Sequence, residues 1–425
     1  MTPPRAAVLL TGNELLRGVI ADRNAAHLAE RLERLGMRMA RVLVVGDEVP
    51  DIETGLRELL EVADLVVTSG GLGPTHDDRT VEAVAAVAGV PLRMDEAILG
   101  RITAWTDAYA ARSGTDPVRY ATGNRKQAHI PEGAEVLGLA GTAPGLVLAL
   151  GEKRVVVLPG VPSELRRLFE DAPGHPLLAG LFDGTHERDR WVTRTYGISE
   201  SRVADLFAEA GGDAPGIETS ICARNYEIEI DVRADPQRAD AAAALVERLR
   251  ALLGGHVFAT GEQPLPAMVL ELARRRGVRI ATAESCTGGM VAAELTSVAG
   301  SSDVVAGGAV TYSDQLKIAL LGVPEQLLAR HGAVSAEVAE AMAAGARQRL
   351  GAEVAVAVTG IAGPGGGSDE KPVGLVHLHV ASPWGGEGAR TQWPGGRADV
   401  RLRATVAALH MLREHLGADS RHFGA

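Results

Sequence analysis

The residues A-E-S-C-T-G-G at 283–289 place hydroxyl side chains beside two glycines. A short apolar run precedes them and a helical pattern follows, which predicts a strand, a tight turn and a helix. Backbone N–H groups at such a turn point outward with the positive end of the helix dipole. They suit an anion, or a carbonyl oxygen that becomes negative during attack. Ser285 or Thr287 is then a candidate nucleophile; the alternative is a helix cap followed by tight packing.

The scarcity of lysine points to one residue in particular. The chain has 43 Lys and Arg residues, of which only four are Lys. Lys can lose its proton and act as a base, whereas Arg stays charged. Lys317 ends the segment T-Y-S-D-Q-L-K (311–317), and a Ser activated by a partly desolvated Lys is a known nucleophile arrangement. Ser285, Lys317 and Tyr312 together favour amide or ester hydrolysis over redox chemistry; the alternative for Lys317 is a solvated helix charge.

A second group of special residues lies in G-G-L-G-P-T-H-D-D-R-T at 70–80, directly after a predicted strand. Gly70, Gly71 and Gly73 allow the backbone to approach a ligand closely. Thr75 and the backbone N–H groups before the next helix can hold phosphate. The pattern therefore favours a phosphate-rich ligand at this turn.

Carboxylates accompany this turn. Asp77 and Asp78 can ligate a divalent cation that bridges phosphates. Glu14 follows the first predicted strand, and ligands of open α/β sheets bind at the carboxyl ends of strands. We therefore expect the three carboxylates to share one sheet edge; the alternative is a Gly-rich turn in which Asp77 or Asp78 caps a helix over 78–88.

Composition limits the function classes. At 425 residues the chain is long enough for two or three domains. The net charge of −11 argues against a nucleic-acid partner held by bulk electrostatics. The chain has only two cysteines, Cys222 and Cys286, which argues against a disulfide framework and fits a reducing compartment. Neither a signal peptide nor a membrane span is expected, so we predict a soluble cytoplasmic protein with no membrane partner.

The elements that position the first turn alternate between strand and helix. Strands are predicted at 5–11, 38–45 and 64–69, with amphipathic helices between them. This β-α-β-α-β order predicts a parallel sheet wrapped by helices in a first domain over 1–170.

A small α+β module is predicted over 171–259, beginning with a linker at 171–190 that is rich in Pro, Gly and charge. Nothing in this module suggests chemistry. Arg224 and Glu227 are interpreted as surface charges, and the module as a spacer or a dimerisation unit.

The last domain, over 266–425, is predicted to be α/β and carries a further Gly-rich turn at 358–367. Thr359 and Gly360 lie in that turn, where Thr359 is expected to face Ser285 from a neighbouring strand end. Arg397 precedes the final helix; it can clamp a phosphate or carboxylate, or simply lie on the helix surface.

These motifs resemble the family of competence/damage-inducible CinA proteins along nearly the full chain. In the first domain the resemblance lies in G-x-E-L-L-x-G (12–18), G-G-L-G-P-T-H-D-D (70–78), G-T-A-P-G (141–145) and L-P-G-V-P-S-E (158–164). In the last domain it lies in A-E-S-C-T-G-G (283–289), V-T-Y-S-D-Q-L-K (310–317), H-G-A-V-S (331–335), V-T-G-I-A-G-P-G-G-G (358–367) and E-K-P-V-G (370–374).

The resemblance implies an N-terminal domain of molybdopterin-binding type, a KH-like middle module and a C-terminal α/β amidohydrolase domain. It implies that the N-terminal domain hydrolyses ADP-ribose to AMP and ribose 5-phosphate with a divalent metal (Mg²⁺ or Co²⁺), K⁺ being a further candidate. It implies that the C-terminal domain, without a cofactor, hydrolyses nicotinamide mononucleotide (NMN) to nicotinate mononucleotide and ammonia. A homodimer is the family expectation.

The resemblance also assigns roles to residues of the C-terminal domain. Ser285 would be the nucleophile and Lys317 its base. Tyr312, Thr359 and Arg397 would position the substrate, with Arg397 near its phosphate. Backbone donors would come from Gly288 and Gly289.

Two other hypotheses compete with a bifunctional enzyme of pyridine-nucleotide recycling. In one, the N-terminal domain binds a pterin or nucleotide without turnover. In the other, the protein is an interaction factor in DNA uptake or repair; the acidic balance argues against direct DNA binding.

Overall fold

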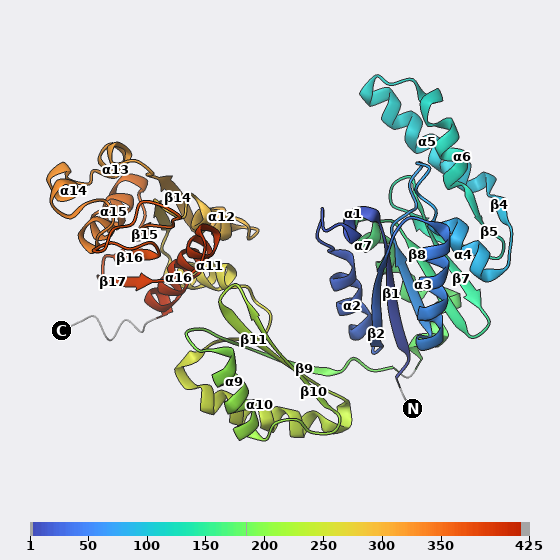
Figure 1. The fold of residues 1–425 in the computed structure, drawn as a ribbon, viewed down its shortest axis with the longest axis horizontal. Coiled ribbons are helices and arrows are strands. Elements are labelled where there is room, and N and C mark those ends of the chain that lie inside the picture. Colours follow the sequence, from blue (N-terminus) through green and yellow to red (C-terminus); the bar gives the residue numbers. More distant parts are fainter. Residues whose placement is uncertain (1–2, 184, 418–425) are drawn as a thin grey trace. The chain divides into compact units, whose positions relative to one another are not determined.

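A computed structural model describes residues 3–183 and 185–417 of the chain. The chain forms two compact units, residues 1–189 and 190–425, which are coloured blue to green and green to red in Figure 1. Among helices within the described ranges, none is long and apolar enough to cross a membrane.

The first unit is built on a mixed six-stranded sheet. Its strand order is β2 (Arg38–Val45), β1 (Arg5–Thr11), β3 (Leu65–Ser69), β8 (Lys153–Leu158), β7 (Pro144–Leu150) and β6 (Glu135–Leu139). The pairs β1–β2, β1–β3 and β3–β8 are parallel, as the β-α-β-α-β pattern predicted, whereas β7 pairs antiparallel with both neighbours. β1 and β3 are buried along almost their whole length and are mostly apolar, because helices bury both of their faces.

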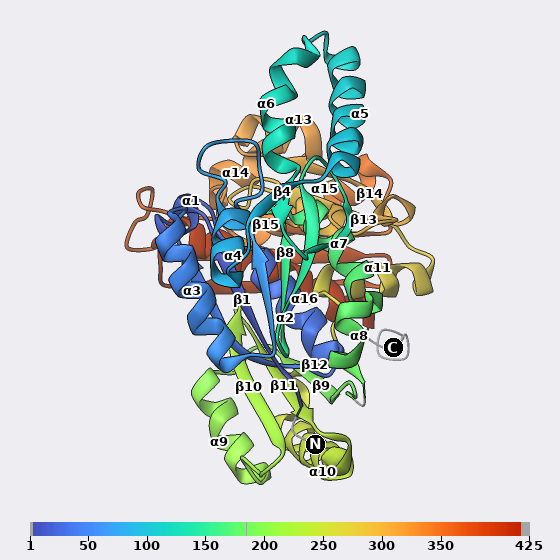
Figure 2. The same cartoon turned by 90° about the vertical axis from the view of Figure 1, so that its right-hand side faces the viewer.

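Helices cover this sheet on two sides (Figure 2). One core contains α3 (Val49–Val62), α4 (Thr80–Ala88) and the start of α5 (Glu96–Ser113). The other contains α2 (Asn24–Arg34), α7 (Pro162–Asp171) and α8 (Pro176–Phe182).

The end of the first unit corrects two sequence predictions. Residues 171–190 were predicted to be a linker, but α8 lies inside them and its Leu178 is only 1% exposed in the core. The first unit therefore reaches Asp189 instead of residue 170. Apolar residues between the prolines and glycines of this stretch were the missed signal.

The second unit contains the middle module and the C-terminal domain together. The module has a sheet ordered β10 (Ile217–Arg224), β11 (Glu227–Ala234), β9 (Asp189–Thr195) and β12 (Val257–Thr260). Two helices, α9 (Glu200–Ala210) and α10 (Ala239–Leu253), pack their apolar residues on this sheet.

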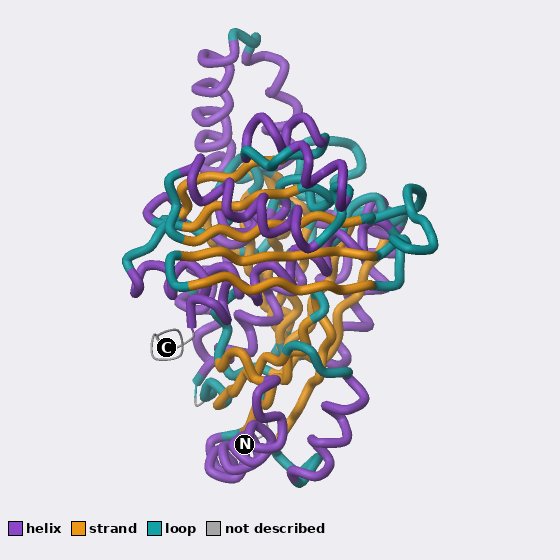
Figure 3. Tube along the Cα trace, turned by 90° about the vertical axis from the view of Figure 1, so that its left-hand side faces the viewer, coloured by secondary structure: helices purple, strands orange, loops and turns teal. Residues whose placement is uncertain are grey.

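The C-terminal domain is a five-stranded sheet between two helical layers. The strand order is β14 (Val305–Val310), β13 (Ile280–Glu284), β15 (Val354–Gly360), β16 (Leu375–Ser382) and β17 (Gly385–Gln392), and Figure 3 shows these strands side by side in orange. β14, β13 and β15 are parallel, and β16 and β17 are antiparallel. β17 was not predicted, because its residues G-G-E-G-A-R-T-Q lack an apolar period.

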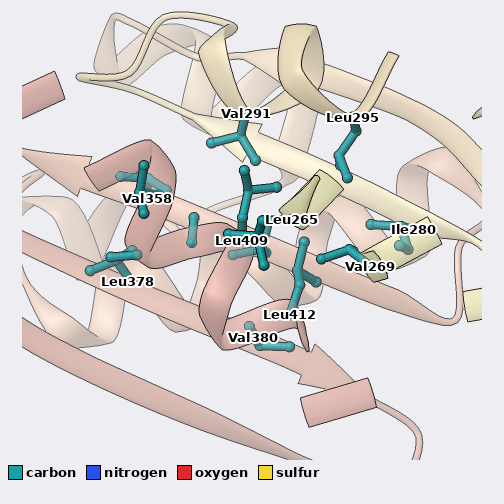
Figure 4. Packing of buried hydrophobic residues seen from close by; sticks show 14 of the residues in the cluster. Leu265, Val269, Ile280, Val291, Leu295, Val358, Leu378, Val380, Leu409 and Leu412 are labelled. Atoms are coloured by element: carbon teal, nitrogen blue, oxygen red, sulfur yellow. The ribbon is translucent and has the colours of Figure 1, made fainter. Parts of the chain in front are cut away.

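Each face of this sheet has its own core. Residues at even positions of β15 pack against α11 (Leu265–Arg276), α12 (Met290–Thr296) and α16 (Arg397–Gly417). Figure 4 labels Val358 of β15 and Leu409 of α16 among the residues of this core. Odd positions pack against α13 (Asp314–Leu321) and α15 (Ala336–Leu350), and α14 (Glu325–His331) joins this layer. Period-two alternation thus decides which side chains at the strand ends face α13.

Candidate active site

The turn after β13 is held by a backbone hydrogen bond to β15 and by an arginine side chain of α16. Ser285 N–H donates to Val358 O at 2.9 Å, so the turn starts as a continuation of the sheet next to β15. The guanidinium of Arg401, on α16, donates to Cys286 O at 3.1 Å and to Thr287 O at 2.9 Å. The sequence analysis did not find Arg401, which lies one helical turn beyond Arg397.

Glu284 organises the far side of the turn. Its carboxylate is fully buried and accepts hydrogen bonds from the N–H groups of Gly289 (2.9 Å), Val291 (3.1 Å) and Ala292 (2.9 Å). A carboxylate at a helix N-terminus is favoured by both the unpaired N–H groups and the helix dipole. The helix end that the sequence offered to a ligand anion is therefore occupied by the chain's own anion.

This arrangement contradicts the expected role of the two glycines. Gly288 N–H donates to Ser285 O at 3.2 Å, and Gly289 N–H donates to Glu284, so neither amide is free to donate to a substrate. Both glycines have positive φ, 63° and 97°, which explains why glycine is needed here. Their contribution is the shape of the turn.

The predicted Ser–Lys pair is brought together across 32 residues of sequence. Nζ of Lys317, on α13, lies 3.3 Å from Oγ of Ser285 and donates to Thr311 O at 3.0 Å. Lys317 is 1% exposed and is the largest fully buried side chain of the described chain. The alternative of a solvated helix charge is therefore wrong for this residue.

Burial controls the protonation of Lys317. Desolvation lowers the pKa of its amine below the ordinary value of 10.5, while the Asp314 carboxylate, 3.7 Å away, opposes the shift. Asp314 is 55% exposed, so water screens much of its effect. A lowered pKa increases the fraction of neutral amine, which is the form that can take a proton from Ser285.

The rival nucleophile Thr287 lacks such a base. Thr287 is fully buried, and its Oγ1 has no hydrogen-bond partner among the described residues. Burial raises the pKa of the Cys286 thiol to about 11, so this side chain stays a neutral thiol near neutral pH. Ser285 is the hydroxyl with a base within reach.

Arg397 and Tyr312 meet at the same end of the domain. The Arg397 guanidinium donates to Tyr312 Oη at 2.7 Å and to Gly363 O, in the Gly-rich turn, at 2.9 Å. Tyr312 is 59% exposed, so both side chains remain accessible to a ligand. These two contacts favour a positioned Arg397 that can bind a ligand over the alternative of an arginine that simply lies on the helix surface.

Thr359 and Gly360 are integrated into the scaffold. The buried Thr359 hydroxyl donates to Ala333 O at 2.7 Å and so fixes the H-G-A-V-S loop. A Cβ at Gly360 would lie 2.8 Å from Leu375 O, so this glycine permits close packing of β15 on β16. Both residues thus contact other parts of the protein, and none of these contacts indicates that they bind the substrate.

The N-terminal unit has a cleft of about 620 Å³ at the carboxyl ends of β1 and β3. It is lined by predicted residues that include Glu14, Gly70, Gly71, Gly73, Thr75, Asp77 and Asp78. The predicted convergence on one sheet edge is therefore observed. A volume in this range suits a nucleotide-sized ligand.

The glycines of this cleft leave no room for side chains. A Cβ at Gly71 would lie 2.2 Å from Thr80 Oγ1, and one at Gly73 would lie 2.5 Å from Asp78 Oδ2. Asp78 accepts from Thr75 N–H at 2.9 Å and so closes the turn. The helix cap of α4 is Arg79, so the alternative in which Asp77 or Asp78 caps that helix is wrong.

The predicted metal ligands do not form a ligand group as they stand. The Thr75 hydroxyl lies within hydrogen-bond distance of both the Asp77 and the Asp78 carboxylate, and no three His, Cys, Asp or Glu side chains in the described ranges converge to hold a metal ion. Oxygen donors would suit Mg²⁺ chemically, but the geometry does not fit a preformed site.

Three further carboxyl groups line the cleft and were missed, namely Asp22, Asp47 and Glu164. Burial raises the pKa of Asp47, with added repulsion from Glu14, Asp77 and Asp78, and burial also raises the pKa of Glu164. Asp47 follows the end of β2, so the rule that strand ends line ligand sites could have found it.

The middle module corrects another prediction. Glu227, interpreted as a surface charge, is 6% exposed and pairs with Arg194 and with His410 of α16, the latter at 2.9 Å. Arg224 is exposed, as expected.

Comparison with known proteins places both ends of the chain in described families. Residues 7–178 match the family described as a probable molybdopterin binding domain, and residues 262–416 match the CinA C-terminal domain. A CinA-like protein of Mycolicibacterium vanbaalenii is 45% identical over 418 residues, which cover 97% of this chain and 98% of that protein. A CinA-like protein of Mycobacterium tuberculosis is 43% identical over 427 residues, covering 97% of each chain. A crystal structure of a competence/damage inducible protein from Agrobacterium tumefaciens is 46% identical, with a TM-score of 0.34, and covers 37% of this chain and 100% of its own.

Proposed function

This chain belongs to the CinA family, and we propose that its C-terminal domain is an amidohydrolase that converts NMN to nicotinate mononucleotide and ammonia. The observation that carries the proposal is the buried contact of 3.3 Å between Lys317 Nζ and Ser285 Oγ. A buried amine with a lowered pKa beside a serine hydroxyl is the arrangement that activates an oxygen nucleophile.

The reaction follows from these two groups. Neutral Lys317 takes the hydroxyl proton of Ser285 as Oγ attacks the carboxamide carbon, and the C=O electron pair moves to oxygen. When the intermediate collapses, the C–N bond breaks and the lysine ammonium gives its proton to the leaving nitrogen, which departs as ammonia. An ester on Ser285 remains.

Water completes the cycle by the same route. It attacks the ester carbonyl while Lys317 accepts its proton, and Ser285 Oγ then leaves and regains a proton from the lysine. The product carboxylate is nicotinate mononucleotide.

The outer residues suit the rest of this substrate. A guanidinium recognises a phosphate through paired N–H groups, and Arg397 is exposed beside Tyr312 at this end of the domain. The carbonyl of Gly363, which holds Arg397, belongs to the Gly-rich turn and would orient the guanidinium before substrate arrives.

Ammonia release from NMN tests the proposal. We expect turnover by the purified full chain and by Ser297→Ala, and none by Ser285→Ala. Ser297 follows α12, and its hydroxyl donates to Glu294 O at 2.7 Å. No turnover by a folded wild type, or turnover retained by Ser285→Ala, would remove this function.

A second function is proposed for the N-terminal unit, namely hydrolysis of ADP-ribose to AMP and ribose 5-phosphate. The cleft of about 620 Å³ with its glycine turn and Thr75 favours a nucleotide ligand. AMP formation should be measured with and without Mg²⁺, in wild type and in Asp77→Asn. Binding of ADP-ribose without any AMP formation would instead support a binding domain.

A further inference from the structure

The hairpin that joins β10 and β11 has an unusual tip. The strands pair Arg224 with Glu227, which leaves Asn225 and Tyr226 as a two-residue turn with φ of 52° and 62°. These are the only residues other than glycine with positive φ in the described chain. Such turns favour Asn followed by Gly, because a side chain in the left-handed region is costly. A Tyr at the second position therefore needs a compensating contact.

The compensating contacts come from the first two turns of α16. The Tyr226 hydroxyl donates to Asp399 Oδ1 at 3.0 Å, and the guanidinium of Arg403 lies 4.2 Å from the centre of the Tyr226 ring. The next residue, Glu227, pairs with His410 two turns further along the same helix. The hairpin tip thus contacts one face of α16 over three turns.

Asp399 links this contact to the candidate active site. Its second oxygen, Oδ2, accepts from Gly396 N–H at 2.9 Å. The hydrogen bond from Gly396 N–H and, to a smaller extent, the one from the Tyr226 hydroxyl lower the pKa of Asp399, so the carboxylate is charged near neutral pH. One carboxylate therefore joins the hairpin tip to the residue that precedes Arg397.

We propose that the hairpin tip is a positioning element of the C-terminal site, in which Tyr226 holds the first turn of α16 and thereby Arg397. The proposal rests on the proposed amidohydrolase function, in which Arg397 binds the substrate phosphate. It gives the middle module, residues outside both matched family domains, a role other than that of a spacer.

The consequence for catalysis is specific. Arg397 acts on the phosphate, away from the reacting carboxamide, and it does so equally before and during the chemical step. Loss of its alignment should therefore weaken substrate binding and leave the Ser285–Lys317 chemistry intact. A structural defect of the whole domain would instead lower kcat and stability together.

Tyr226→Phe tests this inference, because it keeps the ring under Arg403 and removes only the hydroxyl. We expect KM for NMN to rise about fivefold, the value of one net hydrogen bond, while kcat stays within about twofold. The matched control is Asn225→Gly, which relieves the neighbouring positive φ and keeps the Tyr226 contacts; its KM should equal that of the wild type.

A second measurement separates this inference from the proposed function. Hydrogen exchange of the amides at 396–401 should be faster in Tyr226→Phe than in Asn225→Gly, whether or not NMN is a substrate. Unchanged exchange, or faster exchange with an unchanged KM, would overturn the positioning role. If the folded wild type does not turn over NMN, the proposed function fails. The inference is then tested by the affinity for NMN in calorimetry instead of KM. Equal NMN affinities of Tyr226→Phe and the wild type would overturn it.

Discussion

Replacement of Lys317 by Met removes the proposed base and keeps the length and volume of the side chain. Met fills the space of the buried lysine stem, so the fold should persist. Ser285 would then have no base within reach, and the loss of a general base is typically worth about 10³-fold in rate. We therefore expect kcat for NMN to fall about 10³-fold while KM changes less than about threefold, since Arg397 is untouched.

Lys317→Arg sharpens the test, because Arg retains the charge but does not deprotonate in proteins. It should be as inactive as Lys317→Met. The matched control is Lys153→Met in the other unit, where Lys153 only pairs with Asp64 at 3.3 Å and with a carbonyl. Initial rates of ammonia release give kcat and KM for all three. Lys317→Arg that kept a tenth or more of the wild-type kcat would refute the deprotonated-lysine mechanism.

The pH dependence of kcat/KM in the wild type gives a second test of the deprotonated-lysine mechanism. Burial lowers the pKa of Lys317, so kcat/KM should rise with pH, reach half of its maximum at that lowered pKa, and level off above it. Between the lowered pKa and 10.5 the unfolded chain binds more protons than the folded one, so the free energy of unfolding should rise with pH across this window. Lys317→Met should lack this rise in urea titrations.

Three further substitutions test the scaffold. Thr287→Val should raise the free energy of unfolding by about 1 kcal/mol in urea titrations, because it replaces a buried hydroxyl that lacks a partner; a decrease would mean that the hydroxyl is used. Glu284→Gln should lower it by about 3 kcal/mol and reduce turnover, because three N–H groups lose their charged acceptor, whereas the exposed Glu294→Gln should change neither. Gly71→Ala should destabilise the N-terminal unit by at least about 2 kcal/mol more than Gly89→Ala. The two glycines have similar φ, 64° and 69°, but only at Gly71 would the new Cβ clash with a neighbour. Equal losses of stability in the two variants would contradict this reasoning.

The local patterns of the sequence predicted the parallel strands, and the chemistry of the residue types predicted the Ser285–Lys317 pair, although 32 residues separate its two members. Apolar runs bounded by glycine mark buried strands, and the parallel order places their carboxyl ends at one edge. The rarity of lysine singled out Lys317 without any structural knowledge.

What the sequence could not predict depends on contacts between distant residues. The sequence analysis assigned no role to Glu284, and only the fold shows that its carboxylate accepts from three amides at the start of α12. The same is true of Arg401, which was not found and which donates to the turn from α16, and of Glu227, which was interpreted as a surface charge but pairs with His410. A buried charge is recognisable only when its partner is known.

The most direct test of the account is a search for the ester on Ser285. Wild-type protein mixed with excess NMN is quenched in acid during turnover, digested and analysed by mass spectrometry. We expect the peptide that contains Ser285 to carry the acyl group of nicotinate mononucleotide, and the same peptide from Lys317→Met to be unmodified. Turnover by the wild type with this peptide unmodified and another residue acylated would contradict Ser285 as the nucleophile.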